Sequence, residues 1–251
     1  RVRITVGGDR LVYLDDAGSP AANLMETKLL VNSTISDAKN GARFMSADIK
    51  DYFLATPMAK AEYMKVQYKN IPEDIRQRYN LQDKVTTDNC IYIRIKKGMY
   101  GLKQAAILAY DQLKRKLQPH GYSPVVGTVG LWKHATRKTK FCLCVDDFGI
   151  KYYSKADADH LLQAIGGSYK YTTDWEGKNY CGLTFDWNYA LGYVDVSMPG
   201  YVTKTLKRLQ HIPKTYPQYS PHAHVPIQYA TKHTRQYATA PDNSPLLTPV
   251  E

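Results

Sequence analysis

Two adjacent carboxylates, Asp146 and Asp147, interrupt an otherwise apolar stretch of the chain. Residues 141–145 before them and 148–153 after them both predict strands, so the pair lies at the tip of a predicted hairpin. Two carboxylates about 4 Å apart repel by roughly 1 kcal/mol in water and by several times more at a protein surface. A hairpin that ends in such a pair can present it to a cation, although Asp is also a favoured turn residue.

A third carboxylate, Asp48, lies near the end of another short apolar stretch, residues 44–49, which predicts a strand. Carboxylate oxygens that gather from separate strand ends suit Mg²⁺. Two such ions about 3.5–4 Å apart can stabilise the attacking and leaving oxygens of a phosphoryl displacement. Asp48 could instead cap the following turn, and the spacing alone does not exclude this.

The composition favours a polyanionic partner, most simply nucleic acid, with a generic basic surface as the alternative. The chain has 251 residues, and 34 Lys and Arg against 23 Asp and Glu give a net charge of +11. Its 21 Tyr outnumber its 5 Phe, and a Tyr ring can stack on a base while its hydroxyl stays in water. No apolar stretch approaches the roughly 20 residues of a membrane span, so we expect no membrane partner.

The four cysteines lack the CxxC spacing of a zinc site, and unpaired thiols fit a reducing, intracellular compartment. Cys142 and Cys144 alternate within one predicted strand, so we expect them on the same face of it.

The elements that must position these residues follow from periodicity and caps. Residues 1–14 predict a β-hairpin, and Ser19-Pro20 predicts the start of a helix over about 20–36. Pro57 is expected to end the element before it. The other predicted helices lie within 71–80, over 103–118, after a Ser154 cap, and over 201–210. The other predicted strands cover 90–95, 180–187 and 192–197.

Three segments in order carry a family resemblance: Ala-Asp-Ile-Lys-Asp-Tyr-Phe at 47–53, Lys-Lys-Gly-Met-Tyr-Gly-Leu-Lys-Gln at 96–104 and Cys-Val-Asp-Asp at 144–147. Together they resemble three successive motifs of copia-type retrotransposon reverse transcriptases, and the resemblance covers roughly residues 1–210. It implies an α+β, palm-and-fingers polymerase fold with an antiparallel palm sheet flanked by helices.

The same resemblance implies a division of the chain. The implied parts are 1–45, part of the fingers with a connecting helix; 46–57, the palm strand with the first catalytic acid; 58–97, a fingers insertion; 98–198, the palm; and 199–211, the start of a thumb. Residues 212–251 hold 7 of the 13 prolines and are expected to connect to an RNase H domain outside this chain.

By resemblance, Asp48, Asp146 and Asp147 are the catalytic acids, and with the backbone carbonyl of Ile49 they hold Mg²⁺, or Mn²⁺. Phe53 matches the aromatic steric gate that collides with a ribose 2′-hydroxyl. The other positions that match nucleotide-binding residues are Arg3, with Arg1 nearly as good a candidate, and Tyr100, Gly101 and Lys103. A general-acid lysine has two candidates, Lys170 and Lys178.

The implied function is that of an RNA-directed DNA polymerase, which transfers a nucleotide from a dNTP to a primer 3′-hydroxyl on an RNA or DNA template. The chain starts at Arg1 without a leader, so we expect a fragment of a polyprotein whose RNase H and integrase regions lie elsewhere. The family's compartments are a cytoplasmic particle and the nucleus.

Two departures from the family pattern stand out: Cys144 replaces the usual Tyr or Phe, and Ala105-Ala106 replaces a Ser-Pro pair. Three alternatives stay open. The chain could be a catalytically decayed, retroelement-derived nucleic-acid-binding domain, a metal-dependent phosphohydrolase that uses the same acids, or a basic structural module.

Overall fold

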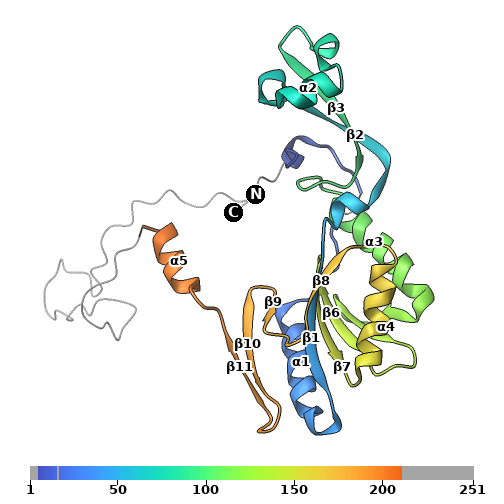
Figure 1. Cartoon of the computed structure of the whole chain (residues 1–251), viewed down its shortest axis with the longest axis vertical. Helices are drawn as coiled ribbons and strands as arrows, with labels where there is room; N and C mark the ends of the chain where they lie inside the picture. The colour runs from blue at the N-terminus through green and yellow to red at the C-terminus, as the bar shows by residue number, and fades with distance from the viewer. Residues whose placement is uncertain (1–4, 16, 211–251) are drawn as a thin grey trace, which may run out of the picture. The chain divides into compact units, whose positions relative to one another are not determined.

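The core of the fold is a six-stranded antiparallel sheet, here called the central sheet (Figure 1). Asp48 lies on its strand β1, Asp147 begins β7, and Asp146 lies in the turn before β7. The structure is a computed structural model that describes residues 5–15 and 17–210. The strand order is β4-β5-β6-β7-β1-β8, and every neighbouring pair is antiparallel. Its strands are β1 (Arg43–Ile49), β4 (Tyr122–Pro124), β5 (Leu131–His134), β6 (Lys140–Cys144), β7 (Asp147–Tyr152) and β8 (Tyr171–Asp174).

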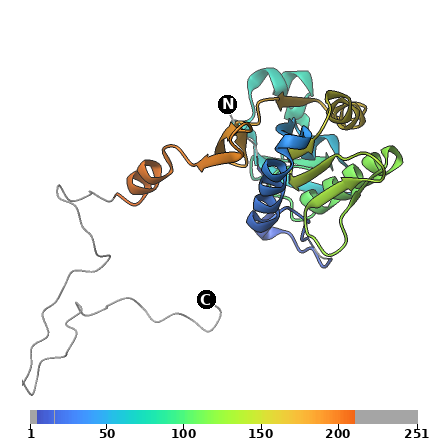
Figure 2. The same cartoon turned by 90° about the horizontal axis from the view of Figure 1, so that it is seen from below.

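Helices cover both faces of this sheet (Figure 1, and from below in Figure 2). On one face lie α3 (Ala105–Leu117) and α4 (Lys155–Gly166), and on the other lies α1 (Leu24–Ser36). The alternation of β1 sets the two layers, because Met45 packs with the core residues of α3 and α4 whereas Phe44 packs with those of α1. The predicted α+β class, with an antiparallel sheet flanked by helices, is confirmed.

A smaller antiparallel sheet packs on the α1 side. It has the order β11-β10-β9, with strands β9 (Asn179–Tyr180), β10 (Leu183–Asn188) and β11 (Tyr193–Ser197). Tyr180 and Phe185 of this sheet lie against Phe44 of β1, with ring centroids 6.1 and 5.7 Å away. The aromatic contact fixes the β9–β10 turn beside the central sheet.

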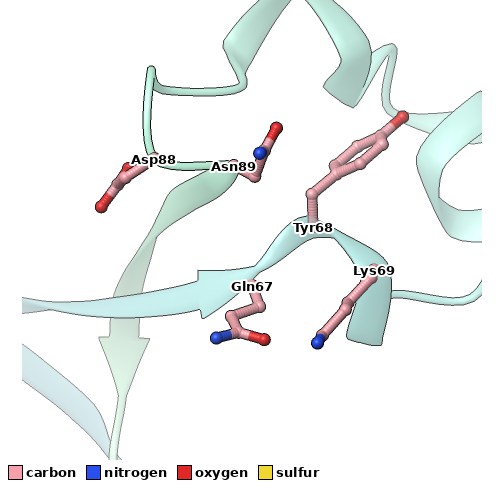
Figure 3. Close-up of a pocket in the computed structure, with 5 residues that line it drawn as sticks. All are labelled: Gln67, Tyr68, Lys69, Asp88 and Asn89. Carbon is pink, nitrogen blue, oxygen red and sulfur yellow. The ribbon is translucent and has the colours of Figure 1, made fainter.

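Strands β2 (Pro57–Gln67) and β3 (Cys90–Lys97) pair into a two-stranded ribbon, and the chain between them includes helix α2 (Glu73–Arg78). At the tip of the ribbon, five residues line a hollow of about 380 Å³: Gln67, Tyr68, Lys69, Asp88 and Asn89 (Figure 3). At its base, the buried Gln104 donates from Nε2 to Glu62 Oε1 at 2.9 Å and so ties the ribbon to the start of α3.

Short 3₁₀ turns complete the described chain: Gly8–Arg10, Ala38–Asn40, Phe53–Ala55, Tyr68–Asn70, Leu81–Lys84 and Gln118–His120. The chain divides into two compact units, residues 1–199 and 200–251, and the second contains helix α5 (Tyr201–Arg208). The predicted connector at 212–251 lies outside the described residues. Within the described part of the chain, no helix has both the length and the apolar character needed to span a bilayer.

Most predicted elements are present, including the helix capped by Ser154, whose side chain accepts the Asp157 N–H. The start of α1 differs from the prediction. Its cap is Asn23 rather than Ser19, because Asn23 forms a reciprocal capping box with Glu26, with hydrogen bonds of 2.9 and 3.1 Å. The Glu26 carboxylate also accepts the N–H groups of Val129 and Gly130, so a distant loop helps to fix where the helix begins.

One other prediction was wrong. Residues 5–15 contain no strand, because the N–H of Val6 donates to Tyr100 O at 2.8 Å and the segment runs beside residues 100–103 instead of folding back on itself. The 3₁₀ turn Phe53–Ala55 ends before Pro57, as predicted, and Pro57 itself begins β2, at the first position of a strand, where a missing N–H is tolerated.

Candidate active site

The sheet register brings Asp48 and Asp147 directly opposite each other. They are partners in the antiparallel β1–β7 pair, and Ile49 N donates to Asp146 O at 3.0 Å just beyond them. This pattern marks a non-hydrogen-bonded pair, in which the Cα atoms lie about 4.5 Å apart and the side chains are close. Asp48 and Asp147 share the face that carries Phe44, so the carboxylates adjoin on the α1 side of the sheet.

Asp146 occupies the two-residue turn between β6 and β7, together with Val145. Val145 has a φ of 60°, a left-handed conformation that is unusual for a β-branched residue. The turn at Asp51, three residues beyond Asp48, also has a positive φ, of 54°. Backbone strain of this kind clusters at functional sites, where the surrounding structure maintains it.

The electrostatics show that the three acids share one environment. Burial, the Asp146 charge and the Asp48 charge together raise the pKa of Asp147 to about 6. The Cys181 thiol donates to Asp147 Oδ2 at 3.8 Å, which partly opposes this rise. Residues that lie about 100 positions apart in the sequence therefore converge at one end of the central sheet.

The donor chemistry of these acids suits a hard divalent cation. Among residues 5–15 and 17–210, no three His, Cys, Asp or Glu side chains are already arranged to enclose a metal ion. Three carboxylates nevertheless supply the oxygen ligands that Mg²⁺ and Mn²⁺ prefer. Burial is the main cause of the raised pKa of Asp147, and the repulsion from Asp146 and Asp48, which adds to it, is the interaction that a bound cation would relieve.

Phe53 and Tyr100 meet edge to face, with ring centroids 5.0 Å apart. Phe53 opens the 3₁₀ turn that follows β1 and is half-buried, in contact with both the central core and the core of the ribbon. The structure thus brings together two of the residues assigned to nucleotide binding by resemblance. Their role in nucleotide binding stays a prediction.

Gly101 and Lys103 both hold the N-terminal segment in place, which is a structural role separate from nucleotide binding. Gly101 has a φ of 92°, and a Cβ there would lie 2.0 Å from Val6 O, so the close approach of the N-terminal segment requires glycine. Lys103 Nζ donates to Leu11 O at 2.8 Å and fastens the same segment. Their nucleotide contacts stay predictions, and Arg3 lies outside the described residues.

Two residues at this end of the sheet were not assigned from the sequence. Tyr52 is 1% exposed, its hydroxyl has no partner in the described part of the chain, and burial, with a smaller contribution from Asp146, raises its pKa. Cys181 approaches Asp147 from the β9–β10 turn. Of the two general-acid candidates, Lys178 forms an ion pair with Glu176, while Lys170 accepts the Lys50 N–H at its carbonyl, at 2.8 Å.

Comparison with solved structures gives a likeness to telomerase from Candida albicans in complex with the TWJ fragment of telomeric RNA. The TM-score is 0.36 and the sequence identity 12%, over 67% of this chain and 33% of that chain. This chain therefore spans about a third of the length of that protein. No protein-family model matches the sequence. No curated protein matches it either.

Proposed function

We propose that this chain is the polymerase region of an RNA-directed DNA polymerase of the copia-type retrotransposon family. The observation that supports this most is the convergence of Asp48, Asp146 and Asp147 at one end of an antiparallel sheet. These are the three acids that the motif resemblance selects, and the β1–β7 register accounts for their meeting. In this proposal the central sheet with α1, α3 and α4 is the palm.

The β2–β3 ribbon then corresponds to the fingers insertion and α5 to the start of the thumb. The net charge of +11 suits binding to the phosphates of a primed RNA or DNA template, without reading of bases, and such binding weakens as salt rises. RNase H and integrase regions of the same polyprotein would act outside this chain.

In the proposed reaction, a primer 3′-hydroxyl attacks the α-phosphorus of a dNTP and displaces pyrophosphate. Mg²⁺, or Mn²⁺, bound by Asp48, Asp146 and Asp147 would acidify the hydroxyl and stabilise the leaving group. The β6–β7 turn contains Asp146, and the register sets Asp147 opposite Asp48. In this proposal the half-buried Phe53 ring, which meets Tyr100 edge to face, would exclude a ribose 2′-hydroxyl.

The test is primer extension by the Asp146→Asn variant with Mg²⁺ and dNTPs. We expect extension to fall at least ~100-fold, since metal-assisted charge stabilisation contributes several kcal/mol to such a step. Asp159→Asn is the matched control, because it removes the same charge from the other face of the sheet, on α4, where Asp159 pairs with Lys155. Binding to a primed duplex is expected to persist in both variants.

Each other result has a meaning. Normal extension by Asp146→Asn overturns the catalytic assignment. Duplex binding without extension by the unaltered chain identifies a decayed nucleic-acid-binding domain. Cleavage of phosphodiesters that needs neither primer nor dNTP identifies a phosphohydrolase.

A further inference from the structure

The two faces of the β2–β3 ribbon differ in character. Residues directly opposite each other in an antiparallel pair share a face, so Tyr63 and its partner Arg94 lie together on one side of the ribbon. Two residues along, Lys65 and its partner Tyr92 lie on the same side. All four side chains are exposed, the two tyrosines by 61% and 59%. We call this surface the front face of the ribbon.

The opposite side, the back of the ribbon, is where the ribbon packs. Ile91 and Ile93 of β3 line an apolar hollow of about 340 Å³ together with residues of the chain between the two strands, among them Ile75 of α2. Ile95, the next residue on this side of β3, is buried. Tyr92 also borders the hollow and nevertheless stays exposed. The alternation of the two strands thus places apolar residues on the back and tyrosines with cations on the front.

The two tyrosines of the front face occupy neighbouring positions. Because Tyr92 lies two residues from the partner of Tyr63, the two are diagonal neighbours, about 7–8 Å apart. An exposed aromatic ring offers a flat apolar surface on which a base of any type can stack. Two such rings side by side suit two bases of an unpaired strand.

Cations accompany these rings. Lys65 Nζ lies 6.0 Å from the centre of the Tyr92 ring, and the lysine also pairs with Asp88, both side chains being about half exposed. An ion pair so open to solvent contributes little, so a phosphate can compete with Asp88 for the lysine. The exposed Arg94 and, two residues on, the exposed Lys96 extend the positive charge along β3.

At the tip of the ribbon the front face continues into the polar hollow described above. Gln67, the next residue of β2 on this face, is one of the residues that line it. In Figure 3 the side chains of Gln67 and Lys69 point to the same side of the chain. The hollow therefore adds an amide and an ammonium group to the surface, which suit base edges and phosphates.

We propose that the front face of the ribbon binds single-stranded RNA or DNA, with bases stacked on Tyr63 and Tyr92 and with phosphates bound by the cations beside them. A single strand fits better than a duplex, because the bases of a duplex already stack on one another and present only their edges. This binding does not depend on the proposed polymerase function, whereas the assignment of the bound strand as the template rests on that function.

The first experiment measures binding of fluorescein-labelled oligo(U) and oligo(dT), about 12 nucleotides long, to the full chain by fluorescence anisotropy. Tyr63→Ala and Tyr92→Ala should each weaken binding about 10-fold, whereas Tyr63→Phe, which keeps the ring, should bind as the unaltered chain does. The matched control is Tyr193→Ala, because that tyrosine is also exposed but lies on β11 in the smaller sheet. Arg94→Gln should lower the slope of log affinity against log salt by roughly 0.7.

Two results of these measurements overturn the proposal. One is unchanged single-strand binding in the double variant Tyr63→Ala/Tyr92→Ala. The other is an equal loss of affinity for a blunt duplex, since stacking on the rings requires unpaired bases.

Ultraviolet cross-linking of oligo(U) to the unaltered chain gives a readout that needs no variant. We expect uridine adducts on the peptides that contain Tyr63 and Tyr92. Adducts confined to other peptides overturn the proposal as well.

Primer extension separates this proposal from the proposed function. Single-strand binding that requires the two rings, in a chain that extends no primer, supports the front face as a binding surface and refutes the polymerase function. Extension by a chain whose single-strand binding ignores the rings does the reverse. If both proposals are correct, the double variant should need about 10-fold more of a primed template with a long single-stranded overhang. An unchanged requirement overturns the assignment of the bound strand as the template.

Discussion

Strand β7 carries opposite electrostatic arrangements at its two ends. At its start, Asp147 faces other carboxylates, Asp48 across the strand pair and Asp146 in the turn. Four residues later and on the same face, Lys151 faces an anion: its Nζ donates to Asp37 Oδ2 at 2.5 Å and also to Ser33 O at 2.9 Å. One end gathers like charges and the other pairs opposite ones.

The pKa values of the two aspartates move in opposite directions for this reason. Hydrogen bonds from Lys151 and Tyr153 lower the pKa of Asp37, whereas burial and neighbouring carboxylates raise that of Asp147 to about 6. The paired end ties β7 to the C-terminal part of α1 and so serves stability. The like-charge end opposes stability, and titratable groups kept in such a state indicate a functional site.

The largest expected effect on stability is at the paired end. Lys151→Ala removes a buried stem and its ammonium, and we expect the free energy of unfolding to fall by about 3 kcal/mol. Lys151→Met retains most of the volume of the aliphatic stem and removes only the ammonium group with its hydrogen bonds. The free energy of unfolding should therefore fall less, by about 1–2 kcal/mol. Chemical denaturation measures both.

The control for that series is Lys155→Ala, which breaks an ion pair whose lysine side chain is 74% exposed. We expect a change of at most about 0.5 kcal/mol. If Lys155→Ala lowered the free energy of unfolding as much as Lys151→Ala, burial would not distinguish the Lys151–Asp37 pair from the Lys155–Asp159 pair.

At the like-charge end we expect the opposite sign. Asp147→Asn should raise the free energy of unfolding at pH 7, without metal, by about 1 kcal/mol, less than the full pKa shift implies because solvent screens a half-exposed carboxyl. A raised carboxyl pKa means that the folded state binds more protons than the unfolded state, so stability rises as the pH falls through about 6 towards 4.

The advantage of the variant should therefore shrink between pH 7 and pH 4, and denaturation curves at several pH values test this. Added Mg²⁺ should stabilise the unaltered chain more than Asp147→Asn, because the cation binds only the folded arrangement of acids. A variant that is less stable than the unaltered chain at pH 7 would contradict the repulsion.

The sequence predicted the like-charge end better than the elements around it. The hairpin around Asp146 was predictable, because apolar residues on both sides of the acids indicate two strands. The acids between those strands must then lie at the turn. Cys142 and Cys144 do share a face, in the layer with α1, as their alternation predicted. The meeting of Asp48 with Asp147 depends on strand register between distant segments. The sequence suggested it only through the chemistry of acids at separate strand ends and through the family resemblance.

Elements without a local signal were missed. Strand β8 reads Tyr-Thr-Thr-Asp, with no apolar alternation, and exists because it pairs with the edge of β1. The alternating residues near Val6 find their partner at Tyr100 rather than in a hairpin. Cys181 gave no signal either, since its contact with Asp147 arises from the packing of the smaller sheet.

The smallest expected effect concerns the strain at Val145. Val145→Gly removes the cost of a left-handed backbone conformation, roughly 1–2 kcal/mol, which stabilises the fold. The same change loses the packing of the valine side chain and raises the entropy of the unfolded chain, which destabilises the fold by about 0.5–1 kcal/mol. These contributions nearly cancel, so we expect unfolding free energy to stay within about 1 kcal/mol of the unaltered value. Val66→Gly in β2, where the valine has ordinary extended geometry, has no strain to relieve and should cost more, about 1–2 kcal/mol. Equal losses at both positions would show that the turn beside Asp146 stores no strain, and the contrast between the two ends of β7 would then rest on charge alone.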